Sequence, residues 1–380
     1  MSEPTIQLLR DLIAIDSVNP SLAVNGAGEK EIADAIASEL RSGGLDVEIQ
    51  EAAPGRSNVI GILDGKKRGR SLMLCGHMDT VGVVGMDAPF DPVEKDGRIY
   101  GRGSQDMKGG LASMMSAALY LARNGGLPAG RVIVAAVIDE EYASIGADAL
   151  VTKWKAGAAV VGEPTDMRIA VGHKGFEWVE IITSGIAAHG SRPEEGRDAI
   201  MRMGRVLSRL EKVNREIQSR DPHPILGTGS LHASLVQGGR ELSTYPDQCT
   251  LKMERRTITG EPARCGLMEV VRILEDLRRE DHEFNATAKF LFSRPQYLTP
   301  ADHDLPKLIE SVLARRAVTT SRAGMSFWTD AAVLGEAGIP SVVFGPGGAG
   351  LHSTSEYVLA SDVLTCRDAL IDLARDFCSV

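Results

Sequence analysis

The 380-residue sequence has little of what marks several classes of protein. Its five cysteines are scattered and form no CxxC pair, which argues against a disulfide framework and against a thiolate zinc site. No apolar stretch approaches the roughly 20 residues that a membrane-spanning helix needs. The N-terminal residues lack the basic start and apolar core of a signal peptide. These absences predict a soluble, cytoplasmic protein with reduced cysteines.

The sequence also lacks an excess of basic residues. It has 42 Lys and Arg against 51 Asp and Glu, a formal net charge of −9. Proteins that bind nucleic acid usually present a basic face, so this balance argues against a nucleic-acid partner. The chain is longer than a usual single domain, and it shows no internal repeat or low-complexity tract. We therefore expect an ordinary globular protein with more than one domain.

The first and last parts of the sequence alternate helical patterns with short apolar runs. Apolar residues recur at helical spacing in residues 4–15 and 28–44, and a third helix is predicted over residues 111–123. Between them lie strand-like runs such as "SLMLC", "RVIVAAVI" and "AAVVGEP". Strands that alternate with helices of this length predict an α/β sheet flanked by helices.

The middle of the sequence follows another pattern. From about residue 176 the predicted order is β-α-β-β-α-β, which is the split βαβ, or ferredoxin-like, arrangement. After it, helices and strands alternate again. The expected layout is an α/β domain with a mixed sheet flanked by helices, interrupted by an inserted four-stranded domain. The expected boundaries are 1–174 and 294–380 for the first domain and 175–293 for the second.

Acidic and imidazole side chains gather at the ends of the predicted strands and in the glycine-rich loops after them. They are His77, Asp106, Glu140, Glu141, Glu163 and His352. In open α/β sheets, binding sites form at the carboxyl ends of strands. Mixed imidazole and carboxylate ligands suit zinc and its divalent neighbours. Six such residues are more than one tetrahedral ion uses, and they suit two ions bridged by a shared carboxylate.

Each of these residues also has an ordinary structural interpretation. A lone histidine at a strand end is more often structural, and Asp106 could simply cap the helix that follows it. The acids at 139–141, however, follow a fully apolar run and emerge from a buried strand, which favours function. Asp79 shares a face with His77 in an extended segment, so its carboxylate can approach the second ring nitrogen and set the tautomer. Glycines around His352 allow the backbone to approach a site closely.

Several other residues give weaker signals. His189 follows small residues and by itself resembles a surface histidine. Arg255 and Arg256 end a predicted strand, and because neighbouring strand residues face opposite ways, one of them is expected to be solvated. Trp328 is expected in the core. Histidines without comparable context are interpreted as structural: His173, His223, His232, His282 and His303.

Eight motifs follow one another in an order that resembles a known family. They are "GHMDTV", "GRGSQDMKGG", "DEE", "VGEPT", "HKG", "AAHGSRPEEG", "FWTDA" and "FGPGGAGLHSTSEYV". The sequence resembles the dinuclear zinc aminoacylase and carboxypeptidase family over nearly its whole length. That family contains acetylornithine deacetylase, succinyl-diaminopimelate desuccinylase and glutamate carboxypeptidases.

The resemblance implies a site with two divalent ions, zinc or alternatively cobalt or manganese. Asp106 would bridge the ions; His77 and Glu163 would complete one site, and Glu141 and His352 the other. The inserted domain is implied to be a lid and dimerisation domain, so a homodimer is expected.

The resemblance also implies roles for residues around the metals. Glu140 would be the general base that takes a proton from the water bridging the ions. Asp79 would lie behind His77. His189 would reach the active site of the other subunit and stabilise the tetrahedral intermediate. Arg256 would bind the substrate carboxylate, with Arg255 as the less favoured candidate.

The implied activity is hydrolysis of the amide bond of an N-acyl amino acid. A carboxypeptidase or dipeptidase of the same family is the alternative, and an inactive binding relative is a remote one, because all six ligand and base positions are intact. The chain departs from many relatives at Ser243, which replaces an asparagine three residues before Pro246, and at Thr259, which replaces a proline. The substrate's acyl group is therefore left open.

Overall fold

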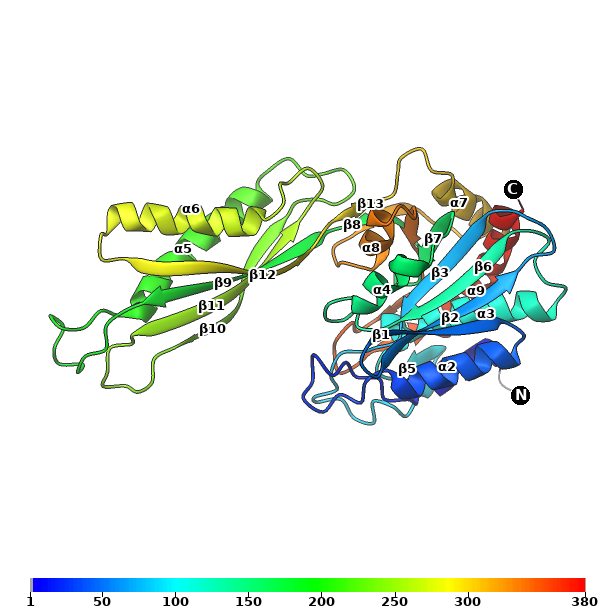
Figure 1. Cartoon of the computed structure of the whole chain (residues 1–380), viewed down its shortest axis with the longest axis horizontal. Coiled ribbons are helices and arrows are strands. Elements are labelled where there is room, and N and C mark those ends of the chain that lie inside the picture. The colour runs from blue at the N-terminus through cyan, green and yellow to red at the C-terminus, as the bar shows by residue number, and fades with distance from the viewer. Residues whose placement is uncertain (1–2, 380) are drawn as a thin grey trace. The chain divides into compact units, whose positions relative to one another are not determined.

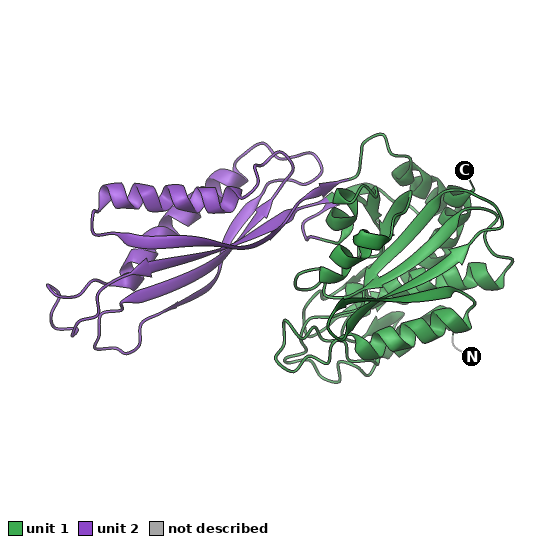
Figure 2. Ribbon diagram, viewed as in Figure 1, with its two compact units in different colours: residues 1–172, 299–323, 329–380 green, residues 173–298, 324–328 purple. Residues whose placement is uncertain are grey.

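The computed structural model describes residues 3–379, and the chain divides into two compact units (Figure 2). Unit 1 comprises residues 1–172, 299–323 and 329–380, and unit 2 comprises residues 173–298 and 324–328. The boundaries predicted at 174/175 and 293/294 lie two and five residues from these limits. Unit 2 runs on to Leu298 and takes in a short return segment. Trp328 explains the return, because its ring packs edge-on against Phe176 at 6.1 Å between centroids.

Unit 1 is built on a mixed sheet (Figure 1). Its strands run in the order β1 (Asp46–Ala53), β2 (Arg56–Asp64), β6 (Arg131–Val137), β3 (Ser71–His77), β7 (Ala158–Val161), β15 (Ser341–Val343) and β8 (Ile169–His173). The central strands β6, β3, β7 and β15 are parallel, whereas β1, β2 and β8 pair in antiparallel fashion. The chain passes between the units near two short strands, β13 (Tyr297–Leu298) and β14 (Arg322–Met325).

Helices pack against this sheet because each has an apolar stripe. The main core takes alternate strand residues, such as Leu72 and Leu74 of β3 and Val132 and Val134 of β6, together with residues of five helices. Those helices are α1 (Pro4–Ile13), α2 (Lys30–Ser42), α3 (Gly109–Arg123), α7 (Leu305–Arg315) and α9 (Ala360–Cys378). Two shorter helices, α4 (Ile145–Lys153) and α8 (Ala331–Glu336), contact strands of the sheet and each other.

A small second sheet in unit 1 joins two loops that are distant in the sequence. It runs β16 (Gly348–Ala349), β17 (Tyr357–Leu359), β5 (Arg98–Tyr100) and β4 (Val93–Lys95). A π-helical turn, η1 (Ser104–Lys108), follows β5 and leads into α3. Asp106 lies inside this turn with extended backbone angles, and Lys108 occupies the N-cap of α3. Asp106 is therefore not the helix cap that its ordinary interpretation suggested.

Unit 2 has the β-α-β-β-α-β order predicted from the sequence. Its elements are β9 (Gly175–Ser184), α5 (Ala199–Gln218), β10 (Ser230–Gly238), β11 (Gln248–Thr257), α6 (Cys265–Glu280) and β12 (Asn285–Arg294). The antiparallel sheet runs β10-β11-β9-β12, and both helices contribute to its apolar core. Among the described residues, no helix is long and apolar enough to cross a membrane.

Candidate metal centre

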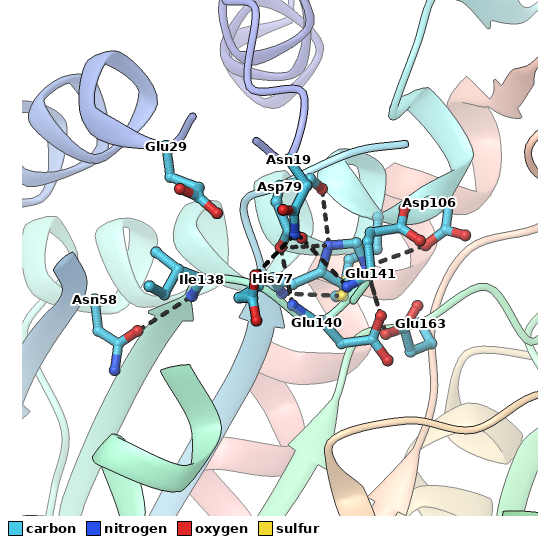
Figure 3. Close-up of polar contacts among 12 residues, drawn as sticks. Asn19, Glu29, Asn58, His77, Asp79, Asp106, Ile138, Glu140, Glu141 and Glu163 are labelled. Atoms are coloured by element: carbon cyan, nitrogen blue, oxygen red, sulfur yellow. Dashed lines mark hydrogen bonds and ion pairs between the residues drawn. The ribbon is translucent and has the colours of Figure 1, made fainter. Parts of the chain in front are cut away.

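Three parallel neighbours of the large sheet end beside one another, and each carries a candidate ligand at its last residue or in the loop just after it. His77 is the last residue of β3, Glu140 and Glu141 follow β6, and Glu163 follows β7. Because β3 pairs in parallel with both β6 and β7, these side chains emerge at the same edge of the sheet (Figure 3). The apolar sequences of the strands therefore position the polar residues that follow them.

The first ligand group is His77, Asp106 and Glu163. Nε2 of His77 lies 3.1 Å from Oδ1 of Asp106 and 3.6 Å from Oε1 of Glu163. One possible ligand atom from each residue lies within 4.8 Å of the others. His77 is 1% exposed and Glu163 is 4% exposed, so this group is buried.

The second ligand group is Asp106, Glu141 and His352. Nε2 of His352 lies 3.2 Å from Oδ2 of Asp106 and 3.1 Å from Oε2 of Glu141. Asp106 thus presents one carboxylate oxygen to each group, which is the geometry of a bridging ligand. The side chain of His352 is 54% exposed, so the second group is open to solvent where the first is not.

The charges of this cluster fit divalent cations. In the part of the chain that is described, the ion pairs of Asp106, Glu140, Glu141 and Glu163 are made with the two histidines. Burial and the neighbouring carboxylates raise the pKa of Glu140, of Glu163 and, to about 7, of Glu141. Oε1 of Glu141 is buried and has no hydrogen-bond partner among residues 3–379. Cations bound in this site would offset the charge of the four crowded carboxylates and would give the unpartnered oxygen a partner.

The histidines respond to the same cluster. Burial opposes a charged His77, but Glu163 and the hydrogen bond with Asp106 outweigh it and raise the pKa of His77. Hydrogen bonds with Asp106 and Glu141 raise the pKa of His352 to about 10. Although burial acts in the other direction, the two histidines lower the pKa of Asp106. Each shift reports a strong electrostatic attraction between the imidazoles and the acids.

The backbone of Asp79, and not its carboxylate, orients His77. Nδ1 of His77 lies 2.9 Å from the Asp79 carbonyl oxygen and 3.6 Å from the carboxylate Oδ1. A carbonyl only accepts hydrogen bonds, so in the neutral ring the proton resides on Nδ1 and the Nε2 lone pair faces the acids. The sequence predicted that the Asp79 carboxylate would set this tautomer, whereas the Asp79 carbonyl oxygen is the nearer group.

The Asp79 carboxylate instead holds the segment that carries the two glutamates. Its oxygens accept the backbone N–H groups of Glu140 at 3.1 Å and Glu141 at 3.2 Å (Figure 3). They also accept the side-chain amide of Asn19 at 2.7 Å. That amide reaches Asp139 as well, at 3.1 Å. Asp79 therefore acts on Glu140 and Glu141 through their backbone.

Sequence reasoning missed the rest of this buried network. Arg56 donates to Asp139 at 2.9 Å and forms an ion pair with Glu29, which is 1% exposed. Asn19 precedes a proline and resembles an ordinary turn residue, and Arg56 begins an ordinary strand. Their partners lie 27 to 120 residues away, so no local pattern marks them.

The remaining predicted site residues lie in unit 2. His189 is exposed, and its Nδ1 lies 2.8 Å from Oγ of Ser191. Arg256 lines a pocket of about 350 Å³ with Lys174, Ser230, His232, Glu254, Ser326 and Phe327. Arg255 faces the opposite way and is fully buried against Glu261 and Glu269. The two arginines thus face opposite ways, as neighbouring strand residues do, and the side chain of Arg256 is 29% exposed.

Similarity to known proteins identifies the family of this chain. The sequence model of peptidase family M20/M25/M40 matches residues 73–376, which is well over half of the sequence. The chain belongs to the peptidase family M20/M25/M40. The resemblance inferred from the motifs is thereby confirmed, and so is the mixed α/β fold. Membership of the M20 family makes the chain a hydrolase of the metallopeptidase class.

Relatives of known name are similar over almost their full length. An acetylornithine deacetylase of Myxococcus xanthus is 30% identical, and the alignment covers 97% of this chain and 96% of that protein. A second acetylornithine deacetylase, from Proteus mirabilis, is 28% identical with 98% and 96% covered. A formyl-aminopyrimidine deformylase of Bacillus subtilis is 27% identical with 99% and 95% covered.

Solved M20 structures share the fold at low sequence identity. A dipeptidase from Saccharomyces cerevisiae superposes with a TM-score of 0.81 at 13% identity, covering 99% of this chain and 96% of that one. A dinuclear metal-binding M20 peptidase from Bacillus subtilis superposes with a TM-score of 0.75 at 18% identity, covering 99% and 98%. At these identities the likeness establishes the architecture of this M20 chain.

Proposed function

We propose that this M20 hydrolase removes the acyl group from an N-acyl amino acid, using two divalent metal ions. The observation that carries the proposal is the shared carboxylate of Asp106, whose two oxygens face two separate histidine-containing ligand groups beside Glu140. The names of the acetylornithine deacetylase relatives support deacylation.

In this proposal one ion is held by His77 and Glu163, the other by Glu141 and His352, and both by Asp106. We propose zinc, because imidazole and carboxylate ligands suit it, and cobalt or manganese would suit the same donors. When bound, two such ions polarise an amide carbonyl and make water acidic near neutral pH.

Glu140 is the proposed general base. Its Oε2 lies 3.9 Å from Nε2 of His77, beside the ligands without belonging to either ligand group. Burial and the nearby Glu163 raise its pKa, which makes the carboxylate a better proton acceptor. It would take a proton from the attacking water and return it to the leaving amine. Its backbone is held in place by Asp79.

Arg256 is the proposed contact for the substrate carboxylate. Its Nε donates to Glu254 at 2.5 Å, and its guanidinium lies 5.5 Å from the centre of the Phe176 ring. Trp178 in turn donates to the second oxygen of Glu254 at 2.9 Å. These contacts hold the guanidinium in the unit 2 pocket, where it can bind a carboxylate through two parallel hydrogen bonds.

His189 is proposed to act across a homodimer, stabilising the developing oxyanion in the partner subunit's site. The test is a mixed dimer of a His189→Ala chain and a Glu140→Gln chain, each inactive by itself. If His189 acts across the dimer, one site of the mixed dimer has both wild-type residues and activity returns. Activity that stays absent would contradict the arrangement.

A substrate panel tests the proposed function. N-acetyl and N-succinyl amino acids, matched analogues with the carboxylate amidated, and dipeptides would be incubated with metal-depleted enzyme plus zinc, cobalt or manganese. We expect metal-dependent cleavage of the N-acyl amino acids and poor cleavage of the amidated analogues. Faster cleavage of dipeptides would favour the peptidase alternative. Full activity without metal would contradict the proposed two-metal mechanism.

A further inference from the structure

A buried carboxylate connects the two loops that carry Asp106 and His352. Glu356 is 1% exposed and accepts four hydrogen bonds. One comes from the Arg102 guanidinium at 2.7 Å. The others come from the backbone N–H groups of Gly103 at 3.0 Å, Gln105 at 2.8 Å and Asp106 at 3.0 Å. We call the pair Glu356 and Arg102, with these bonds, the Glu356 clamp.

The clamp binds the backbone of Asp106 and of the residue that follows His352. On one side Glu356 binds the N–H of Asp106 itself. On the other side Arg102 donates from its second terminal nitrogen to the carbonyl oxygen of Ser353, at 3.0 Å, directly after His352. The antiparallel pairing of β5 with β17 holds the two segments side by side. Residues about 250 positions apart in the sequence are thereby joined.

Few other contacts fix the loop that carries His352. Its residues from Leu351 to Ser355 are exposed, and His352 has a left-handed backbone conformation with φ of 58°. Packing therefore does little to place the imidazole ring. A metal ligand in such a loop depends on hydrogen bonds outside the ligand set to hold its geometry.

We propose that Glu356 and Arg102 are positioning residues that set the placement of Asp106 relative to His352, and thereby the affinity for the ion that these two residues share with Glu141. This inference rests on the metal-binding part of the proposed function. It goes beyond that proposal because neither residue belongs to either candidate ligand group. The physical reason is that the clamp replaces loop packing with a charge-assisted hydrogen-bond network.

The test is Glu356→Gln in the full-length, metal-depleted chain, titrated calorimetrically with Zn²⁺ alone. Glutamine keeps the shape but loses the charge and turns an amide NH₂ toward N–H donors. We expect affinity for one of the two ions to fall by about 10- to 100-fold, the range found when partners outside the ligand set are lost. The affinity for the other ion should change less.

Glu177→Gln is the matched control. Glu177 is also buried, at 2% exposure, and accepts backbone N–H groups of Gly266 and Leu267 at the start of α6. It has no bond to either ligand group, so both ions should bind within threefold of wild type. Arg102→Lys is the second clamp variant, because lysine keeps the charge but cannot reach Glu356 and Ser353 together through two nitrogens.

The outcomes separate the two proposals. Clamp variants that bind both ions within threefold of wild type would overturn the positioning role, even where the metal-free chain unfolds at a lower temperature. If Glu356→Gln does not fold, the titration of Arg102→Lys decides. Wild-type chain that fails to bind two ions would overturn the proposed function itself, and the clamp with it.

Discussion

The two units bury carboxylates in opposite ways. In unit 2, Arg255 is fully buried and its guanidinium donates to both Glu261 and Glu269. Glu177 is satisfied by backbone N–H groups where α6 begins. Each buried acid in this cluster has a protein donor or cation beside it, so the cluster is electrostatically complete.

At the sheet edge of unit 1, the acids face one another instead. Glu140, Glu141 and Glu163 have raised pKa values because they are buried together without a lysine or arginine partner among the described ion pairs. The comparison teaches that burial of acids does not by itself mark a site. What separates a candidate site from a structural cluster is whether the protein supplies the compensating charge.

The largest expected effect is on catalysis at the sheet edge of unit 1, where the described acids lack a lysine or arginine partner. Glu140→Gln should lower kcat by about 10²- to 10⁴-fold, because it removes the general base. Metal content, measured by elemental analysis, should stay at two ions per chain. Glu269→Gln, which removes an acid from the compensated cluster, should leave kcat near wild type. Activity of Glu140→Gln within tenfold of wild type would remove Glu140 from the base role.

The next prediction separates two neighbouring arginines on opposite faces of β11. Arg255→Met should destabilise unit 2 by about 3 kcal/mol, because it removes the fully buried cation from Glu269 and leaves Glu261 with Arg220 alone. Arg256→Met should change stability little and raise KM for N-acyl amino acids. Urea unfolding and steady-state kinetics measure the two effects. If both variants behaved alike, the division between structural and substrate-binding arginine would be wrong.

The smallest expected effect concerns a histidine without an acid partner. Burial lowers the pKa of His173 to about 4, against an ordinary value of 6.5, and its Nε2 has no hydrogen-bond partner within the described chain. The unfolded chain therefore takes up this proton more readily. The stability contributed by neutral His173 is present above pH 6.5 and is lost as the pH falls toward 4.

The variant His173→Leu tests this direction of the pH dependence of stability. Between pH 7 and pH 5 the wild-type chain should lose about 2 kcal/mol more unfolding free energy than the variant, since one pKa unit corresponds to about 1.4 kcal/mol. Urea unfolding of metal-depleted protein at both pH values measures the difference. An equal loss in both chains would show that His173 does not contribute to acid sensitivity.

Much of the fold was predictable because its signals are local. The alternation of strands and helices, the inserted β-α-β-β-α-β unit and the apolar runs before His77 and Glu140 all follow from residue spacing. The contacts that no local pattern showed depend on backbone groups or on partners farther along the chain. His77 is oriented by the carbonyl of Asp79, and Arg255 is buried by acids that lie 6 and 14 residues away.

Residue type and apolar periodicity are local properties, and they were enough to predict the candidate ligands of this M20 chain and the strand ends that carry them. The packing of distant segments places one oxygen of Asp106 toward His77 and the other toward His352. It also decided that Glu356 binds the loop of Asp106 from about 250 residues away. Such placements depend on the packing of distant segments to within an ångström or so, which no local pattern in the sequence records.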